Sequence, residues 1–438
     1  MVSPKRREEI LDALRRGTVP QDGLDVFAVG LERFEGTVDT ELRRVQEGGS
    51  AFKAIRGDYG CGKTFFSRWL QERARRLGFA TTEVQISETE TPLHRLETVY
   101  RRMLERLATS SVRTAAFRSI VDAWFYALEE DVLSTGNFAG SDDYRLLAET
   151  NRLMEKRLEK ISQSAPSFSA ALRGYREALA QGETAAAEGL IAWLSAQPNV
   201  GAAVKRAANL KGEVDHFAAL SFLQGLLVVL RDSGHAGVVL VLDEVETLQR
   251  IRIDAREKAL NALRQLIDEL DAGRFPGLYL LITGTPTFFD GPQGINKLVP
   301  LAQRLHTDFD TEARFDNPRA PQMRLQAFDL NLLMAVGRKV RDLYASGSSV
   351  GKRVVAVADD ALIQALAKGV AGRFGGKIGI APRIFLKKLV ADLLDRIELH
   401  ADFDPRRDYR LIVREEELSD EERNLAPAGS VDEIALKL

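Results

Sequence analysis

A glycine-rich segment, GDYGCGKT at residues 57–64, has the spacing of a phosphate-binding loop at every fixed position. Its glycines allow backbone N–H groups to turn toward phosphate oxygens, and the helix that follows directs its positive end at the same anion. The Lys63 ammonium can reach the β- and γ-phosphates, and the Thr64 hydroxyl can ligate Mg²⁺. We therefore expect one run of residues to bind ATP: Gly57, Asp58, Tyr59, Gly60, Cys61, Gly62, Lys63, Thr64 and Phe65.

Two adjacent acids end an apolar run further along the chain, VVLVLDE at residues 238–244, which fits a Walker B strand. Adjacent carboxylates at the end of a buried strand are unfavourable unless they meet a cation or solvent. We expect Asp243 to hold Mg²⁺ through its water shell and Glu244 to activate the attacking water as a general base. The pair favours hydrolysis over a small-molecule kinase, whose substrate hydroxyl replaces that water. Glu246, a third acid nearby, is expected to be structural or solvated rather than catalytic.

Cys61 is the single cysteine of the chain and lies inside the phosphate loop. A helix N-terminus lowers the pKa of a thiol, so one interpretation is a redox-sensitive switch on nucleotide binding. The other is a small side chain tolerated at a variable loop position, which we favour because no second cysteine is available to resolve an oxidised form. The lone cysteine also excludes an intrachain disulfide, as expected of a protein of the reducing cytoplasm.

The elements that must position these residues alternate between strand and helix, which indicates an α/β fold with a parallel sheet. Buried strands are predicted at 51–57 and 81–87, with an amphipathic helix between them, and at 237–244 and 277–286. The first helix is expected to start at Ser3 and Pro4, as cap and first turn.

Regions on either side of these strands read as helical. A short helix is predicted from about residue 38 to 46, before Gly48 and Gly49. From about residue 92 to 230 the pattern is almost wholly helical, and we interpret it as an insertion into the α/β core.

The order of motifs resembles the core of an AAA+ ATPase: a phosphate loop, an Asp-Glu strand end, then a buried strand that ends in a polar residue. In that family the polar residue senses the γ-phosphate, a role that the resemblance gives to Thr283, with Thr285 as a close alternative. A later arginine often completes the site of a neighbouring subunit. Arg304 lies at a suitable distance for this role, and a plain salt-bridging or solvated arginine is the alternative.

The same resemblance implies two further contacts to the nucleotide. Arg383, which follows Pro382 at a helix start, resembles the lid arginine of the sensor 2 position. The segment FAVGLERF at residues 27–34 resembles the lining of an adenine pocket, with Val29 and Gly30 nearest the base.

The resemblance leads to a division of the chain into five parts. We expect N-terminal helices and the adenine-side segment at 1–50, the first part of the P-loop core at 51–91, a helical insertion at 92–234, the second part of the core at 235–325, and a helical lid domain with an acidic tail at 326–438.

Longer segments resemble the BrxD-type ATP-binding proteins of BREX phage-defence systems: ILDALRRGTVP, GLDVFAVGLERF, FKAIRGDYGCGKTFFSRWL, EVQISETETPLHRLETVYRRM, LVLDEVETLQR and APRIFLKKLV. The resemblance runs from near the N-terminus to about residue 400. It implies an ATPase that acts beside other defence proteins, often including a helicase-like partner. Our main hypothesis is an Mg²⁺-dependent AAA+ ATPase of antiphage defence that forms a homo-oligomer through its nucleotide site. The alternative is a nucleotide-dependent switch or scaffold with slow hydrolysis, which assembles partners that act on DNA.

Composition limits how the chain could meet DNA or a membrane. Lys+Arg total 61 and Asp+Glu total 63, a net charge of -2, so a DNA contact would have to be a local patch. Two groups could meet phosphates: Arg101, Arg102 and Arg106, and Arg406, Arg407 and Arg410. Glu97 and Glu105 interleave with the first group and favour a salt-bridged face there. The charged N-terminus predicts no signal peptide, no apolar run is long enough to predict a membrane helix, and the scattered histidines predict no zinc site.

Overall fold

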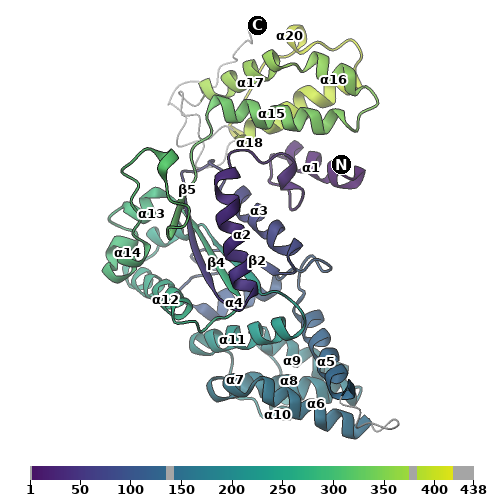
Figure 1. Cartoon of the computed structure of the whole chain (residues 1–438), viewed down its shortest axis with the longest axis vertical. Coiled ribbons are helices and arrows are strands. Elements are labelled where there is room, and N and C mark those ends of the chain that lie inside the picture. Colours follow the sequence, from purple (N-terminus) through teal and green to yellow (C-terminus); the bar gives the residue numbers. More distant parts are fainter. Residues whose placement is uncertain (1, 135–142, 374–381, 418–438) are drawn as a thin grey trace.

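A five-stranded parallel sheet forms the centre of the computed structural model, which describes residues 2–134, 143–373 and 382–417 (Figure 1). The strand order is β2-β3-β4-β1-β5. The strands are β1 (Ala51–Arg56), β2 (Ala80–Gln85), β3 (Val238–Asp243), β4 (Leu278–Gly284) and β5 (Gln322–Arg324). The prediction of an α/β fold with a parallel sheet is confirmed, and the short edge strand β5 is an addition to it.

The register of the sheet brings the ends of neighbouring strands together. Gln85 of β2 is opposite Asp243 of β3, and Ile55 of β1 is opposite Thr283 of β4. Because β4 lies between β1 and β3, Thr283 stands between the strand that leads into the phosphate loop and the strand that ends in the two acids. Because the strands are parallel, their C-terminal ends lie at the same edge of the sheet. Gln85, Asp243 and Thr283 therefore lie together at that edge.

Helices cover both faces of the sheet, which explains why its central strands are continuous apolar runs. One face packs against α2 (Glu32–Gln46) and α3 (Lys63–Arg76), with Val239, Val241 and Tyr279 in the same core cluster. The other face, which includes Leu240 and Leu280, packs against α4 (Leu96–Glu105), α11 (His216–Asp232) and α12 (Ile253–Asp271). Successive residues of a strand point to opposite faces, and the two clusters follow that alternation.

Helix α2 is longer than the sequence predicted, since it begins at Glu32 rather than near residue 38. Gly36 lies inside it and interrupts the pattern of helix-forming residues, which explains why the sequence placed the start too late.

A helical group extends from one end of the core, at the bottom of Figure 1. It contains α5 (Phe117–Ser134), α6 (Asp143–Arg157), α7 (Glu159–Ser164), α8 (Pro166–Ala180), α9 (Thr184–Leu194) and α10 (Ala202–Ala207). Its aromatic core includes Phe168 and Trp193, and both rings pack against Phe222 of α11. The group is thereby joined to the helix that covers the sheet.

Several short helices follow β3 and β4 in the chain. They are η2 (Val245–Gln249) after β3, then α13 (Pro286–Asp290), η3 (Ile295–Lys297), α14 (Val299–Leu305) and η4 (Ala313–Phe315) between β4 and β5. Two of them, α13 and α14, are labelled on the left of Figure 1.

A second helical group lies at the opposite end, at the top of Figure 1. It contains α15 (Leu330–Ala345), α16 (Gly351–Val357), α17 (Asp360–Arg373), α18 (Pro382–Lys387), the π-helical turn η6 (Lys388–Leu394), α19 (Asp395–Leu399), α20 (Pro405–Asp408) and η7 (Glu415–Glu417). The acidic tail that the sequence predicted lies outside the described residues from position 418 onward.

The N-terminal helix α1 (Pro4–Arg15) packs against this C-terminal group, although the two are far apart in sequence. Arg15 Nε donates a hydrogen bond to Asp395 Oδ2 at 2.9 Å, and Arg15 Nη2 donates to Asp395 Oδ1 at 3.0 Å. Ser3 caps α1 and Pro4 is its first residue, which confirms the predicted start. The turn η1 (Leu24–Val26) follows on the way to the core.

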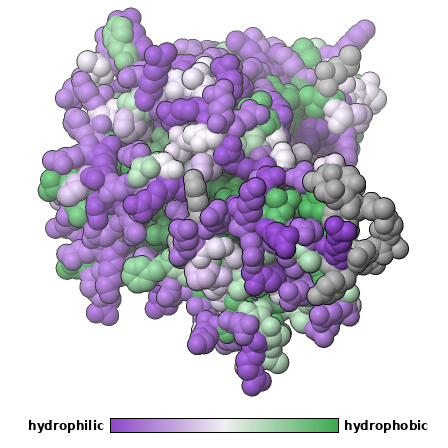
Figure 2. Space-filling view, turned by 60° about the horizontal axis from the view of Figure 1, so that its bottom comes forward, coloured by the Kyte–Doolittle hydropathy of each residue, from purple (hydrophilic) through white to green (hydrophobic). Residues whose placement is uncertain are grey.

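None of the helices among the described residues is both long and apolar enough to cross a membrane. Hydrophilic residues cover most of the face seen in Figure 2, and the hydrophobic residues on that face lie in small, separate groups.

Candidate nucleotide-binding site

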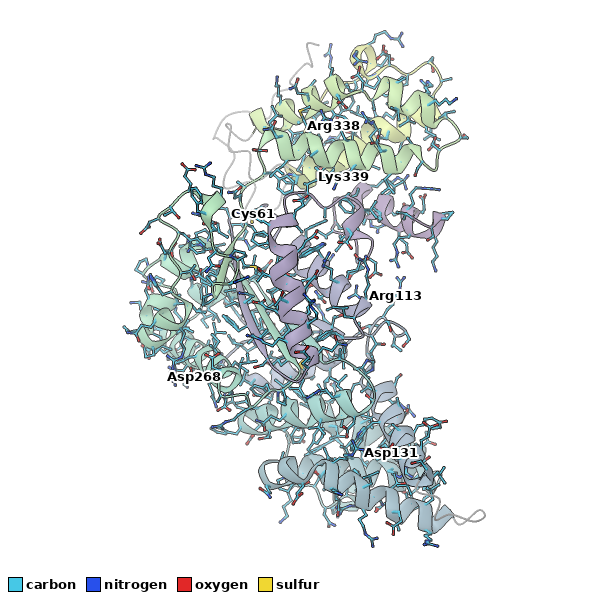
Figure 3. The ribbon with its side chains drawn as sticks, in the orientation of Figure 1. Cys61, Arg113, Asp131, Asp268, Arg338 and Lys339 are labelled. Atoms are coloured by element: carbon cyan, nitrogen blue, oxygen red, sulfur yellow. The ribbon has the colours of Figure 1, made fainter. Side chains whose placement is uncertain are left out.

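A cavity of about 730 Å³ lies between the phosphate loop and the C-terminal helices. Its walls come from the phosphate loop, the C-terminal end of β3, the end of α1 and the segment after it, the segment before α2, and helices α15 and α18. Cys61 of the loop lies between the core and the C-terminal group, below Arg338 and Lys339 of α15 (Figure 3). A volume of this size is typical of a small-molecule or cofactor site.

The phosphate loop turns tightly between β1 and α3. Gly60 and Gly62 have positive φ angles of 78° and 97°, which favour glycine. Gly57 is packed so closely that a Cβ atom there would lie 2.3 Å from Cys61 Sγ. Residues Tyr59 to Phe65 line the cavity, whereas Gly57 and Asp58 do not.

Lys63 is folded back over this loop. Its Nζ donates hydrogen bonds to the carbonyl oxygens of Gly57, at 2.8 Å, and Asp58, at 3.3 Å. The same nitrogen lies 4.9 Å from the centre of the Tyr59 ring. Gly57 and Asp58 therefore act on the cavity through their carbonyl groups, which hold the lysine that lines it.

The acidic strand end is organised by Thr283. The Thr283 hydroxyl donates a hydrogen bond to the buried carboxylate of Asp243 and accepts one from the backbone N–H of Glu244, at 3.1 Å. Asp243 and Glu244 line the cavity, whereas Thr283 is buried outside it and contacts both residues. Thr285, the alternative, precedes α13 as its cap. A hydroxyl at Thr64 and a carboxylate at Asp243 are the oxygen donors that Mg²⁺ prefers.

Glu244 adopts a left-handed backbone conformation, with φ of 58° and ψ of 46°. For a residue other than glycine this conformation costs about 1–3 kcal/mol and is concentrated at functional sites. Gln85 Nε2 donates a hydrogen bond of 2.9 Å to Glu244 Oε2. The turn at Glu244 also directs the chain into η2 and back toward the loop.

Glu246 is brought by this turn into the wall of the cavity, close to Lys63. Its side chain is 4% exposed, and its Oε1 lies 3.9 Å from Lys63 Nζ. Neither carboxylate oxygen has a hydrogen-bond partner in the protein. Burial raises the pKa of the Glu246 carboxyl to about 7, and the Lys63 ammonium partly offsets this increase. Of the two alternatives expected for Glu246, structural or solvated, burial excludes the solvated one.

The opposite wall of the cavity is apolar and could accept a base ring. Val29 and Gly30, the residues expected nearest the base, line it. They are joined there by apolar side chains from three other segments: Phe65, Phe328, Leu332, Val336 and Leu386. Lys339 Nζ donates to the Ala28 carbonyl oxygen at 2.5 Å, which ties the segment before α2 to α15.

The two predicted arginines lie in different places. Arg383, in the first turn of α18, lines the cavity, and its Nη2 donates to the Glu417 carbonyl oxygen at 2.6 Å. Arg304, on α14, does not line it. Its side chain forms an ion pair with Asp268 of α12, which lies far from Cys61 in Figure 3.

Cys61 does not have the properties of a reactive thiol. It is 4% exposed, and burial raises the pKa of its thiol to about 11. The interpretation that the helix N-terminus lowers this pKa is wrong, because burial outweighs the nearby Lys63 charge.

Several of the arginines that could meet DNA form ion pairs within the chain. Arg102 pairs with Glu90 and Glu105, which fits the salt-bridged alternative. In the second group, Arg406 pairs with Asp359 and Arg407 pairs with Asp408.

Sequence reasoning did not find Gln85, and it undervalued Glu246. Part of the signal for Gln85 was available: it lies in the strand predicted at 81–87, which in the structure pairs with the acidic strand so that Gln85 is opposite Asp243. Glu246 carried no such signal, because only the left-handed turn at Glu244 determines where it points.

A five-stranded parallel sheet, with a cavity between its glycine-rich loop and its acidic strand end, is compatible with the core of a P-loop nucleotide-binding protein. A protein-family model described as BREX system ATP-binding protein BrxC/D matches residues 2–413, nearly the whole chain. The protein belongs to this family, and the resemblance to the BREX ATP-binding proteins that the sequence indicated is confirmed. No curated protein and no solved structure matches the chain.

Proposed function

We propose that the protein is an Mg²⁺-dependent AAA+ ATPase that hydrolyses ATP in the cavity between the sheet edge and the C-terminal lid. The single observation that carries this proposal is the convergence of Lys63, Asp243, Glu244 and Thr283 at one edge of the sheet. The family description supports ATP as the ligand. The position of Thr283, on the strand between the loop strand and the acidic strand, supports the AAA+ resemblance.

The loop from Gly57 to Phe65 would bind the phosphates, with Lys63 on the β- and γ-phosphates. Thr64 and Asp243 would hold Mg²⁺, which supplies charge neutralisation when bound. No cluster of three or more His, Cys, Asp or Glu residues in the described part of the chain could hold a metal alone. This suits Mg²⁺, which usually takes one or two protein ligands and completes its shell with phosphates and water.

Glu244 would accept a proton from the attacking water, and two neighbours would keep it in place. Gln85 holds its carboxylate, and the Thr283 hydroxyl holds its backbone N–H. Val29 and Gly30 would contact the base, and Arg383 would reach the phosphates from the lid. Arg304 remains our proposal for an arginine that acts on the next subunit of a homo-oligomer, which would require it to leave Asp268.

We propose that ATP use is coupled to other proteins of the BREX system in the cytoplasm, and through them or directly to DNA. The near-balance of charge, -2 overall, favours action through partners or local patches over coating of DNA. The second candidate is a nucleotide switch or scaffold with slow hydrolysis. The helical group α5–α10 supports it, because this group is remote from the cavity and could serve as a surface for partners.

The substitution Glu244→Gln tests hydrolysis. It should reduce ATP turnover by about 100-fold or more, because the general base is lost, while ATP binding persists. Glu83→Gln is a matched control, since Glu83 is a largely buried carboxylate on β2 outside the cavity. Turnover is measured with and without duplex DNA and partner proteins. Wild-type turnover in Glu244→Gln would contradict the assignment, and brisk DNA-stimulated hydrolysis in the wild type would reject the slow switch.

A further inference from the structure

The buried carboxylate of Glu246 beside Lys63 has no part in the proposed hydrolysis. It lines the cavity, is 4% exposed, and lacks any hydrogen bond within the protein. A buried carboxylate without hydrogen bonds is strongly unfavourable unless a cation compensates it. Lys63 Nζ, at 3.9 Å from Oε1, is the cation that ion-pairs with it. The contact is therefore an electrostatic one, which a stronger anion could displace.

Lys63 already has partners in this arrangement. An ammonium group has three N–H donors, and two of them are directed at the carbonyl oxygens of Gly57 and Asp58. The Glu246 carboxylate supplies the nearby negative charge. The phosphates of a nucleotide would need the same ammonium group. Its charge is already partly compensated by the Glu246 carboxylate.

The backbone around Glu246 is anchored by an ordered turn. The left-handed turn at Glu244 starts η2, and the Thr247 hydroxyl anchors that turn to the carbonyl oxygens of Glu244, at 3.0 Å, and Ile86, at 3.2 Å. Val245 and Leu248 are buried on either side. The backbone at Glu246 is therefore held in the cavity wall, which places its carboxylate beside Lys63.

We propose that Glu246 is a positioning residue that competes with nucleotide phosphates for Lys63, and thereby weakens the binding of di- and triphosphates and speeds their release. This inference rests on the proposed function, because the competing anion is the phosphate chain of ATP or ADP. It assigns to Glu246 a role distinct from that of the base, Glu244.

The substitution Glu246→Gln removes the charge and retains the shape. ATP and ADP should then bind about tenfold more tightly or better, because a negative charge beside the β- and γ-phosphates is lost. AMP should bind with unchanged affinity, because its single phosphate does not extend to the lysine. The affinities are measured by calorimetric titration at about pH 8, where a carboxyl with a pKa of about 7 is mostly ionised.

Matched variants separate charge from structure. Glu246→Asp keeps the charge and should restore wild-type discrimination between AMP and ADP. Glu83→Gln removes a largely buried carboxylate outside the cavity and should leave all three affinities unchanged. If Glu246→Gln does not fold, Glu246→Met, which is similar in length and neutral, carries the same expectation. The titrations are repeated in EDTA, where the tightening should persist if Glu246 acts on Lys63 rather than on a metal.

The possible results distinguish a failure of the Glu246 proposal from a failure of the proposed ATPase function. If the wild type binds neither ATP nor ADP, the proposed function fails. If the wild type binds them and the neutral variants bind them no more tightly, the inference is overturned while the proposed function stands. Equal tightening of AMP, or tightening that disappears in EDTA, would also overturn it.

Discussion

The Thr283 hydroxyl, from a neighbouring strand, contacts both acids of the site. It donates to Asp243 and accepts from the Glu244 N–H, so one side chain orients both the residue proposed to hold the metal and the proposed base. Because the hydroxyl is fully buried, no water can replace it in these contacts.

We therefore expect Thr283→Val to reduce ATP turnover by about 10- to 100-fold, as is usual when a partner of a metal ligand is removed. The free energy of unfolding should fall by about 1–3 kcal/mol, because Asp243 loses a hydrogen bond in a buried place. Turnover assays and chemical denaturation measure the two effects. Thr285→Val is the control, and a larger loss of turnover there than at Thr283 would show that the alternative hydroxyl is the functional one.

Cys61 allows a prediction about pH. Burial raises the pKa of its thiol to about 11, so at pH 8 it holds less of the reactive thiolate than a free cysteine does. Alkylation of the folded protein should be slow near neutral pH and should accelerate as pH rises toward 11. Mass spectrometry gives an unambiguous rate because the chain has a single cysteine. Equal rates for the folded and the urea-unfolded chain at about pH 8 would contradict the burial of this thiol.

The residues that the sequence could identify are those whose chemistry is local. The phosphate loop is one continuous segment with fixed spacing, and the Asp243–Glu244 pair ends an obvious strand. Gln85 and Glu246 reach the site through strand pairing and through a turn with a positive φ, and residue types alone do not encode either.

The elements of the core were predictable to the extent that they are long and apolar. The four longer strands lie within one or two residues of their predicted ranges, because strands covered on both faces read as continuous apolar runs. Strand β5 has three residues, too few to show a period. Helix α1 was predicted, but its packing against α18 and η6 depends on residues more than 350 positions away.

Glycines inside helices give a test of the packing between elements. Gly225 of α11 faces Phe168 of α8 so closely that a Cβ atom would lie 2.5 Å from its ring, and the ring is fully buried. Gly225→Ala should therefore lower the free energy of unfolding by about 1–3 kcal/mol, despite the better helix propensity of alanine. Gly36→Ala is the matched control, because nothing lies within 4 Å of its added Cβ, and it should stabilise α2 by about 0.5–1 kcal/mol. Chemical denaturation measures both, and an unchanged Gly225→Ala would contradict the packing of α8 on α11.

At the scale of the whole molecule, the cavity is shared between the core and the C-terminal helices. The phosphate loop and the acids belong to the core, whereas Leu332, Val336 and Arg383 belong to the upper group in Figure 1. Helix α1 joins that group through Arg15 and Asp395, and the chain then returns to the core through η1. A ligand in the cavity should therefore stabilise both parts together, by about 2.7 kcal/mol at a concentration 100 times its Kd.

Amide hydrogen exchange with and without ATP tests this account most directly, because it locates the ligand on the chain. We expect ATP to slow exchange in three separate segments: the phosphate loop at 57–65, the segment before α2 at 27–34, and the start of α18 at 382–387. The variant Lys63→Ala should lose this protection, since the phosphates lose their cation. Absence of protection in the wild type, or protection that leaves out the phosphate loop, would contradict the claim that this cavity binds ATP.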